Sequence, residues 1–182
     1  RGNPNLQVSD ATNLDARYQF YWDDIDNISF GVFYKELDNP IERVVNVASG
    51  TVGNSRTFQN SDSAEIYGIE LEGRKGWNIG NSLSKSFFIA ANASWIESEV
   101  QLTGQAINTR ALQGQPEYVV NLIFGYDDID NGQELTVLLN QNGDTIADVG
   151  INGQADIILE PRLDLTFNYR WFFTDSWQLV VK

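Results

Sequence analysis

Two pairs of carboxylates are the side chains best suited to acid–base chemistry in this sequence. Glu70 and Glu72 are two residues apart, as are Glu97 and Glu99, so each pair shares one face of a strand. Such pairs could imitate the acid and nucleophile of a glycosidase. The alternative is that the first pair belongs to a wetted strand face and the second to the start of a loop. We favour this alternative and assign no catalytic residue.

The composition excludes most other site chemistry. The chain of 182 residues contains no cysteine and no histidine, which excludes Ser-His-Asp and Cys-His nucleophile systems. It also removes the usual nitrogen and sulfur ligands of zinc, copper and iron. Glycine-rich phosphate motifs are absent, so nucleotide binding has no support. We therefore predict no metal, no cofactor and no enzymatic activity. The net charge of −13 argues against nucleic acid as a partner.

An acidic segment occurs twice: residues 22–27 (WDDIDN) resemble residues 126–131 (YDDIDN). One interpretation is a calcium loop, but Gly132 comes one place early for an EF-hand and the distal glutamate is missing. The other interpretation is a tight turn, because Asp and Asn side chains bond locally to the backbone. We predict turns. Four strands separate the copies, so both turns belong at the same end of a sheet.

Alternation of apolar and polar residues recurs along the chain, whereas a helical period is almost absent. Residues 163–171 (LDLTFNYRW) are the clearest case. The pattern predicts an all-β, antiparallel up-and-down meander of about eight strands. The predicted strands are residues 13–22, 28–36, 65–73, 87–95, 118–126, 135–139 and 163–171, with a last one opening at Trp177.

The lengths of the strands and connections favour a membrane barrel. Most segments run about 9 to 12 residues, near the 9–11 that tilted strands need to cross a bilayer. Short connections alternate with long ones, and a meander places all the short turns at one end. That asymmetry is typical of outer-membrane barrels. The short connections are residues 23–26, 78–85, 127–132 and 174–175, and the long ones are residues 38–63, 98–116 and 143–161.

Aromatic residues gather at the ends of the predicted strands. They predict a girdle at one membrane interface, with Trp95, Tyr67 and Tyr118 near the other. Alternatively, these rings cap a soluble core. The residues at the short-turn ends are Trp22, Trp77, Tyr126, Trp171 and Trp177.

Charged residues fall into two sets. On the polar strand faces, we expect Arg17, Arg74 and Arg170 to form ion pairs with carboxylates such as Asp15, Glu72 and Asp164 along a water-filled wall. The full predicted lumen set is Arg17, Glu70, Glu72, Arg74, Asp164, Asn168 and Arg170.

The second charged set lies in the long connections, where ligand contact and ordinary solvated surface are equally compatible with the sequence. Substrate-binding residues therefore stay unassigned. The set comprises Glu42, Asp62, Glu99, Asp144, Asp148 and Asp156, beside Arg43, Arg56 and Arg110.

Several short motifs occur in an order that resembles the barrel of TonB-dependent outer-membrane receptors. The opening GNPNL (2–6) and TNLD (12–15) is followed by FYK (33–35) and NPI (39–41). NSDSAEIYGIELE (60–72) and LQGQPEY (112–118) come next. LDL (163–165) and YR (169–170), before Trp177, resemble the family's penultimate hairpin. Together the motifs cover essentially the whole chain.

The resemblance implies that residues 1–182 are the C-terminal part of a barrel of about 22 strands, without the plug domain, the TonB box and the last strand. The chain begins at Arg1 without an initiator methionine, which we interpret as a cut. Implied partners are outer-membrane lipid, the TonB complex through the plug domain, and a transported ligand. The location implied is the outer membrane of a Gram-negative bacterium. The ligand is not fixed, since the family carries iron chelates, cobalamin, nickel complexes and oligosaccharides.

Two other architectures fit the same pattern. One is a complete eight-stranded outer-membrane barrel with a structural or adhesive role. The other is a soluble β-sandwich that binds carbohydrate, in which residues 118–126 and 163–171 would face each other across a core.

Overall fold

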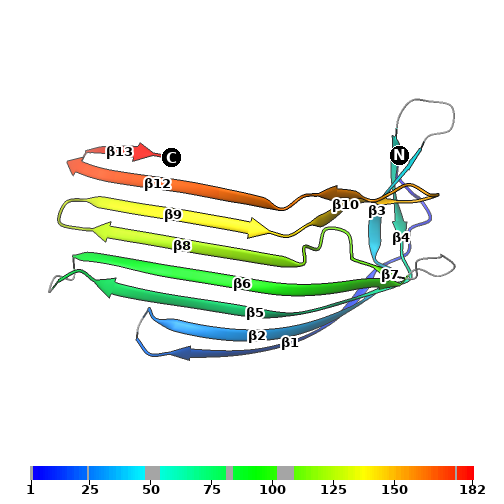
Figure 1. Ribbon diagram of the computed structural model, residues 1–182, viewed down its shortest axis with the longest axis horizontal. Helices are drawn as coiled ribbons and strands as arrows, with labels where there is room; N and C mark the ends of the chain where they lie inside the picture. Colours follow the sequence, from blue (N-terminus) through cyan, green and yellow to red (C-terminus); the bar gives the residue numbers. More distant parts are fainter. Residues whose placement is uncertain (1, 24, 48–53, 81–83, 102–108, 175) are drawn as a thin grey trace.

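Eight strands form one antiparallel meander in the computed structural model, which describes residues 2–23, 25–47, 54–80, 84–101, 109–174 and 176–182 (Figure 1). Their order in the sheet is β1-β2-β5-β6-β8-β9-β12-β13. Within these residues there is no helix long and apolar enough to cross a membrane. The strands are β1 (Asp10–Tyr21), β2 (Asn27–Asp38), β5 (Ser63–Asn78), β6 (Lys85–Gln101), β8 (Tyr118–Asp128), β9 (Gln133–Asn142), β12 (Arg162–Thr174) and β13 (Trp177–Val181).

The all-β meander predicted from the sequence is confirmed. Each of the eight predicted segments falls on one strand of the meander. All the short turns lie at one end of the sheet and the long connections at the other (Figure 1). Parts of the predicted connections lie outside the described residues: residues 24, 81–83 and 175 of the short ones, and residues 48–53 and 102–108 of the long ones. The sandwich is wrong, because β8 and β12 flank β9 in the same sheet and do not face each other.

The register keeps apolar and polar rows on opposite faces across the whole sheet. Side chains alternate with period two, so a register that aligns one apolar row aligns all of them. One row runs through Ile89, Phe124, Val137 and Phe167, each paired with the next. The opposite face carries a polar row: Glu72, Asn92, Asn121, Asn140 and Asp164.

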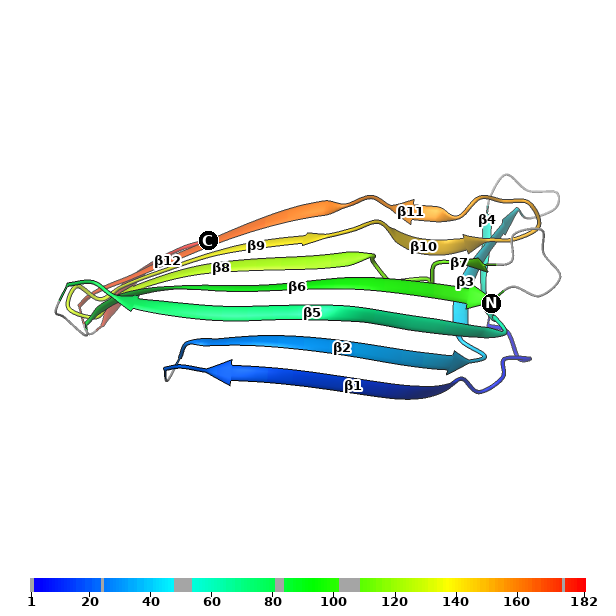
Figure 2. The ribbon, with the colours of Figure 1, turned by 60° about the horizontal axis from the view of Figure 1, so that its bottom comes forward.

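The sheet is open along its two sides. Among the described strands, β1 pairs only with β2 and β13 pairs only with β12. A closed eight-stranded barrel would require β1 and the last strand to pair with each other. The chain instead forms a long arc, as the second view shows (Figure 2).

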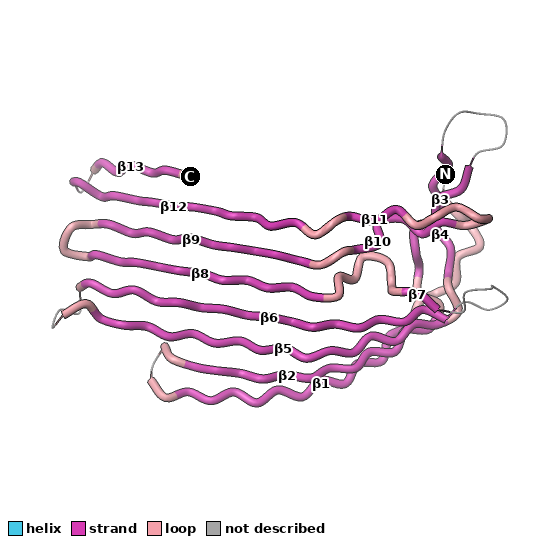
Figure 3. The backbone as a smooth tube through the Cα atoms, viewed as in Figure 1, coloured by secondary structure: helices cyan, strands magenta, loops and turns pink. Residues whose placement is uncertain are grey.

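A second, smaller sheet occupies the long connections (Figure 3). It consists of β3 (Ile41–Val47), β4 (Asn54–Asn60), β10 (Thr145–Gly150) and β11 (Ile157–Leu159), in the order β11-β10-β3-β4. β10 pairs with β3 in parallel, and β7 (Thr109–Arg110) pairs with the end of β6. The prediction that these segments are connections without strands is wrong here. β3 has two adjacent buried valines, Val44 and Val45, in place of an alternation, and the pairing that joins β3 to β10 spans about a hundred residues of the chain.

A small apolar core holds this second sheet together. Val44, Ile146 and Val149 are buried in it, and Ala111 and Ile151 pack against them. We call β3, β4, β7, β10, β11 and residues 111–115 the cap, since these strands lie together at the long-connection end of the meander (Figure 3).

Candidate functional site

The apolar face of the meander, which we call the outer face, exposes many large hydrophobic side chains, and their contact with water would be unfavourable. Leu14 is 71%, Leu71 53% and Leu165 68% exposed. A contiguous exposed apolar surface of this extent marks a contact with a membrane or another protein. Strands that alternate apolar-out and polar-in are the arrangement of transmembrane barrels.

Aromatic residues edge this face at the short-turn end, as predicted. The rings of Trp77 and Phe87 stack with centroids 4.9 Å apart. The ammonium of Lys75 lies 5.9 Å from the rings of both Trp22 and Trp77, and it donates a hydrogen bond to Asp26 in the adjoining turn. That hydrogen bond is the main reason why the pKa of Asp26 lies below its ordinary value. Amphipathic rings and a snorkelling lysine are typical of a membrane interface.

Both acidic segments form turns, but only the second has its acid bonded locally to the backbone, as predicted; in the first, the acid bonds to a neighbouring strand. The carboxylate of Asp26 accepts the amide of Gly76 at 2.7 Å. That of Asp128 accepts the backbone and side-chain nitrogens of Asn131 at 3.1 and 2.7 Å. Both turns lie at the same end of the sheet (Figure 1).

The opposite, inner face carries a row of amides that are hydrogen-bonded across neighbouring strands. The amide nitrogen of Asn121 donates to Asn92 Oδ1 at 2.8 Å, and that of Asn140 donates to Asn121 Oδ1 at 2.5 Å. These asparagines are absent from the lumen set predicted from the sequence. Their polarity was a usable signal, but only the register shows that they meet.

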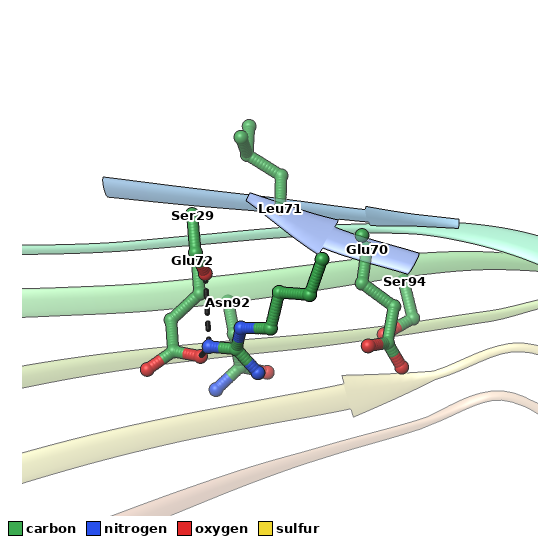
Figure 4. A pocket seen from close by; sticks show the side chains of 8 residues that line it. Ser29, Glu70, Leu71, Glu72, Asn92 and Ser94 are labelled. Carbon is green, nitrogen blue, oxygen red and sulfur yellow. Dashed lines mark hydrogen bonds and ion pairs between the residues drawn. The ribbon is translucent and has the colours of Figure 1, made fainter. Parts of the chain in front are cut away.

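A hollow on the inner face shows how the carboxylate pair of β5 is arranged (Figure 4). Glu70 and Glu72 point to one side of the sheet and Leu71 points to the other (Figure 4). Arg17 Nη2 donates to Glu72 Oε2 at 2.5 Å and to Ser29 Oγ at 2.9 Å. In the part of the chain that the structure describes, Glu70 has no hydrogen-bond or ion-pair partner. The pair shares a wetted face, as predicted.

The remaining residues of the predicted lumen set also lie on the inner face, with different partners from those expected. Arg170 pairs with Glu134 at 2.9 Å and not with Asp164. Asp164 instead binds Arg162 at 2.7 Å. Asn168 is paired in register with Thr136.

Arg74 departs from the expected ion pair. Its guanidinium lies 4.2 Å from the centroid of the Phe88 ring, and no ion pair of Arg74 is found among the described residues. The ring of Phe88 in turn covers Gly125, where an added Cβ would lie only 2.1 Å from a ring atom. Glycine at this position allows the aromatic ring to lie flat against the sheet.

The cap is held by buried carboxylates. Glu42 is 2% exposed and accepts hydrogen bonds from Arg110 Nη1 at 2.8 Å, Ser61 Oγ at 2.5 Å and the amide of Gln113 at 3.1 Å. Burial alone would raise the pKa of Glu42, but the hydrogen bonds from Arg110 and Ser61 keep it below its ordinary value. Glu42 is therefore ionised and fully paired.

Asp148 is the second buried carboxylate, with 1% of its surface exposed. Its carboxylate accepts hydrogen bonds from Nε of Arg43 and, at 2.9 Å, from Nε of Arg56. The side chain of Gln113 completes the junction, since it accepts the amide of Arg43 at 2.6 Å and donates to the carbonyl of Ala147 at 2.7 Å. The three long connections are thus joined to one another.

Neither interpretation of the charged residues in the long connections describes Glu42 and Asp148, which are buried structural partners. Asp156 is also structural, because its carboxylate accepts the amide of Gly150 at 2.8 Å. The sequence could not show the burial of Glu42 and Asp148, since it depends on contacts with Arg110, 68 residues from Glu42, and with Arg43, 105 residues from Asp148.

Comparisons with known proteins agree with the arrangement of the sheet. The family model described as "TonB dependent receptor-like, beta-barrel" matches residues 1–180. The crystal structure of the siderophore receptor PirA from Acinetobacter baumannii superposes with a TM-score of 0.57 at 19% sequence identity, over 92% of this chain and 26% of that one. A comparison with curated proteins gives no match.

The two findings carry different weight. At 19% identity, the likeness to the solved receptor shows the fold alone, and the chain spans about a quarter of that receptor's length. The family model covers nearly every residue, and its members are transport receptors rather than enzymes. This chain belongs to the TonB-dependent receptor-like β-barrel family.

Proposed function

We propose that this chain forms part of the wall of an outer-membrane receptor that takes up a ligand with energy from the TonB system. The observation that carries the proposal is the two-faced sheet. Its outer rows are apolar and exposed, while its inner rows are polar and hydrogen-bonded from strand to strand. A sheet of this kind separates lipid from a wet interior.

The open sides of the sheet support an arc rather than a complete barrel. Unpaired strand edges cannot remain in a lipid bilayer, because their backbone groups would lack hydrogen-bond partners. We infer that residues 1–182 supply about eight strands of a larger barrel, and the resemblance to the receptor family implies about 22 strands in all. The plug domain and the contact with the TonB complex belong to other parts of that receptor. The outer-membrane lipid contacts the outer face described here.

The orientation of the two faces is tested most directly with cysteines placed one at a time in this part of the receptor, which has none of its own, with the unsubstituted receptor as the labelling control. Leu122 and Asn121 are neighbours on β8 and belong to opposite faces. A bimane label at Leu122→Cys in the full-length receptor should be quenched by brominated lipid, whereas the same label at Asn121→Cys should not. Equal quenching at both positions would remove the basis of the proposal.

The transport step is tested in cells. Bacteria that express the full-length receptor should deplete one or more solutes from the medium, and a strain without functional TonB should not. Depletion that persists without TonB would show a passive pore instead of an energised receptor.

A further inference from the structure

We propose that Asn152, in the loop that joins β10 to β11 in the cap, is a site of spontaneous chemical modification (Figure 2). The backbone amide of Gly153 displaces ammonia from the side chain of Asn152, and the residue becomes aspartate or isoaspartate. Such a modification goes beyond the proposed function, because it is a reaction of the chain itself and needs no ligand.

The dipeptide Asn-Gly occurs three times in the sequence, at residues 131–132, 142–143 and 152–153. Glycine after asparagine favours the reaction, because no side chain shields the attacking backbone nitrogen and because glycine has wide conformational freedom. From the sequence alone the three dipeptides are equivalent. They differ in the hydrogen bonds and the packing around each glycine.

The first dipeptide is held by hydrogen bonds on both residues. The amide of Gly132 donates to the carbonyl of Ile129 at 3.3 Å, and the carbonyl of Gly132 accepts the amide of Phe172 at 2.7 Å. The side-chain nitrogen of Asn131 donates to Asp128 at 2.7 Å. The attacking nitrogen and the leaving nitrogen are therefore both engaged.

The second dipeptide is bonded and also packed. Gly143 is buried, and its amide donates to the carbonyl of Tyr118 at 2.9 Å. An added Cβ at Gly143 would lie 3.0 Å from the Tyr118 ring, and the side-chain nitrogen of Asn142 donates to the carbonyl of Gly143 at 3.3 Å. An amide that already donates a hydrogen bond must lose that bond before its nitrogen can be deprotonated and attack, which slows the reaction.

The third dipeptide has neither restraint. Asn152 and Gly153 are exposed, and an added Cβ at Gly153 would meet nothing within 4 Å. In the part of the chain that the structure describes, neither the side chain of Asn152 nor the amide of Gly153 takes part in a hydrogen bond.

The turn that contains this dipeptide can open at a small cost. Asn152 and Gly153 have positive φ angles of 56° and 83°, and ring closure requires the peptide between them to rotate out of this turn. The bond that closes the turn, from the amide of Gln154 to the carbonyl of Ile151, is long at 3.3 Å. Asn152 is therefore the reactive member of the three.

The reaction is balanced with water as the one added reactant. The deprotonated amide nitrogen of Gly153 forms a bond to Cγ of Asn152, and the bond from Cγ to Nδ2 breaks. Nδ2 leaves as ammonia, which carries the proton that the amide lost. Water then opens the cyclic imide. Opening at Cγ produces aspartate, whereas opening at the main-chain carbonyl produces isoaspartate, in which the chain continues through Cγ.

The product changes the hairpin of β10 and β11. Either form adds a negative charge at Asn152, and isoaspartate adds one carbon atom to the main chain. Gly150 packs against the carbonyl groups of Gln154 and Ala155, and its amide donates to Asp156 at 2.8 Å. A lengthened loop displaces these contacts, so we expect the end of β10 to open more often.

The experiment compares the three asparagines in one sample. The full-length receptor in lipid nanodiscs is incubated in mildly alkaline buffer, and deamidation of each site is followed by mass spectrometry of its peptides. We expect Asn152 to react about tenfold faster than Asn131 or Asn142, because a hydrogen bond to the reacting amide changes a rate by about this factor. A rate at Asn152 no greater than at the other two would overturn the proposal.

The control is the receptor unfolded in guanidinium chloride before the incubation. The three sites should then react at similar rates, since a glycine follows each asparagine. If the unfolded receptor shows the same preference for Asn152, the fold does not cause it and the proposal fails.

A variant tests the consequence for the cap. Asn152→Gln keeps the amide group but lengthens the side chain, which disfavours ring closure. After equal incubation, hydrogen exchange in the peptide that contains Gly150 should be about tenfold faster in the wild type and unchanged in the variant. Equal acceleration in both would refute the role of Asn152. The reaction needs neither TonB nor transport, so failure of energised uptake in cells would leave this result standing.

Discussion

Replacement of Asp148 by asparagine is expected to loosen the cap without disturbing the meander. The change preserves the shape of the side chain but removes the charge that both Arg43 and Arg56 use. It also turns an NH₂ group toward donors that need an acceptor. Hydrogen bonds to charged groups contribute about 1.5–3 kcal/mol each. The two arginines are half-exposed, so water recovers part of the loss, and we expect about 2–3 kcal/mol in total.

The free energy that the variant removes should appear as faster local opening of the cap. Since 1.4 kcal/mol corresponds to a factor of ten, amide exchange in residues 145–151 should accelerate about 30- to 150-fold. The amide of Ile151 is a direct reporter, because it donates to the carbonyl of Val45 across the β10–β3 junction at 3.2 Å. Hydrogen–deuterium exchange with mass spectrometry on the receptor in nanodiscs provides the measurement.

A matched control tests the reasoning. Asp164→Asn removes a carboxylate that is 43% exposed and paired with an arginine that is 76% exposed. Such a pair contributes at most about 1 kcal/mol, so residues 145–151 should be unaffected. The reasoning fails if Asp148→Asn leaves cap exchange unchanged, or if exchange in β8 and β9 rises equally, since the effect would then be global.

Three further predictions concern the two faces and the buried acid. Leu122→Lys on the outer face should lower the free energy of unfolding by about 2–4 kcal/mol in urea titrations with lipid vesicles, and Asn121→Lys by much less. Gly125→Ala should lower the free energy of unfolding by about 1–3 kcal/mol, because the added methyl group displaces the Phe88 ring. In the Phe88→Ala background the same substitution should cost less, and strictly additive effects would contradict the contact. The pKa of Glu42 is lowered on folding, so its ionised form stabilises the cap fully above the unfolded pKa of about 4.3. This stabilisation is lost as the pH falls through the lower pKa of the folded state. The hydrogen-exchange protection factors of cap amides should therefore fall over that pH range in the wild type and not in Glu42→Gln.

The meander could be predicted from the sequence because each strand shows its own alternation of apolar and polar residues. Alternation in residues 163–171 places Leu165 and Phe167 on one face with no knowledge of the neighbouring strands. Antiparallel strands that follow one another in sequence then pair in order, and the short turns come to one end. The same two rules place the aromatic residues at the strand ends on the side of the short turns.

The cap could not be predicted because it depends on contacts between segments that are far apart in the chain. The short β3 and β10 strands carry no sustained alternation, and their parallel pairing joins Val44 to Val149. The same limit applies to individual side chains. Arg170 was expected near Asp164, six residues away, but the register of β9 brings Glu134 opposite to it. Gln113 was part of a recognised motif, yet its role at the junction requires three segments at once.

The parallel junction between β3 and β10 also bears on the order of folding. Arg43 and Asp148 are 105 residues apart, and Glu42 and Arg110 are 68 apart, whereas neighbouring hairpins close over short turns. Contacts of high sequence separation carry a large loop-closure entropy and form late. The cap is thus expected to close after the hairpins between β1 and β12 have zipped. A slip of two residues between neighbouring strands from β2 to β9 shifts everything beyond it by about 7 Å, which would leave Asp148 out of reach of Arg43. The contacts of the cap are therefore expected to form only when the strands that carry them are in the native register.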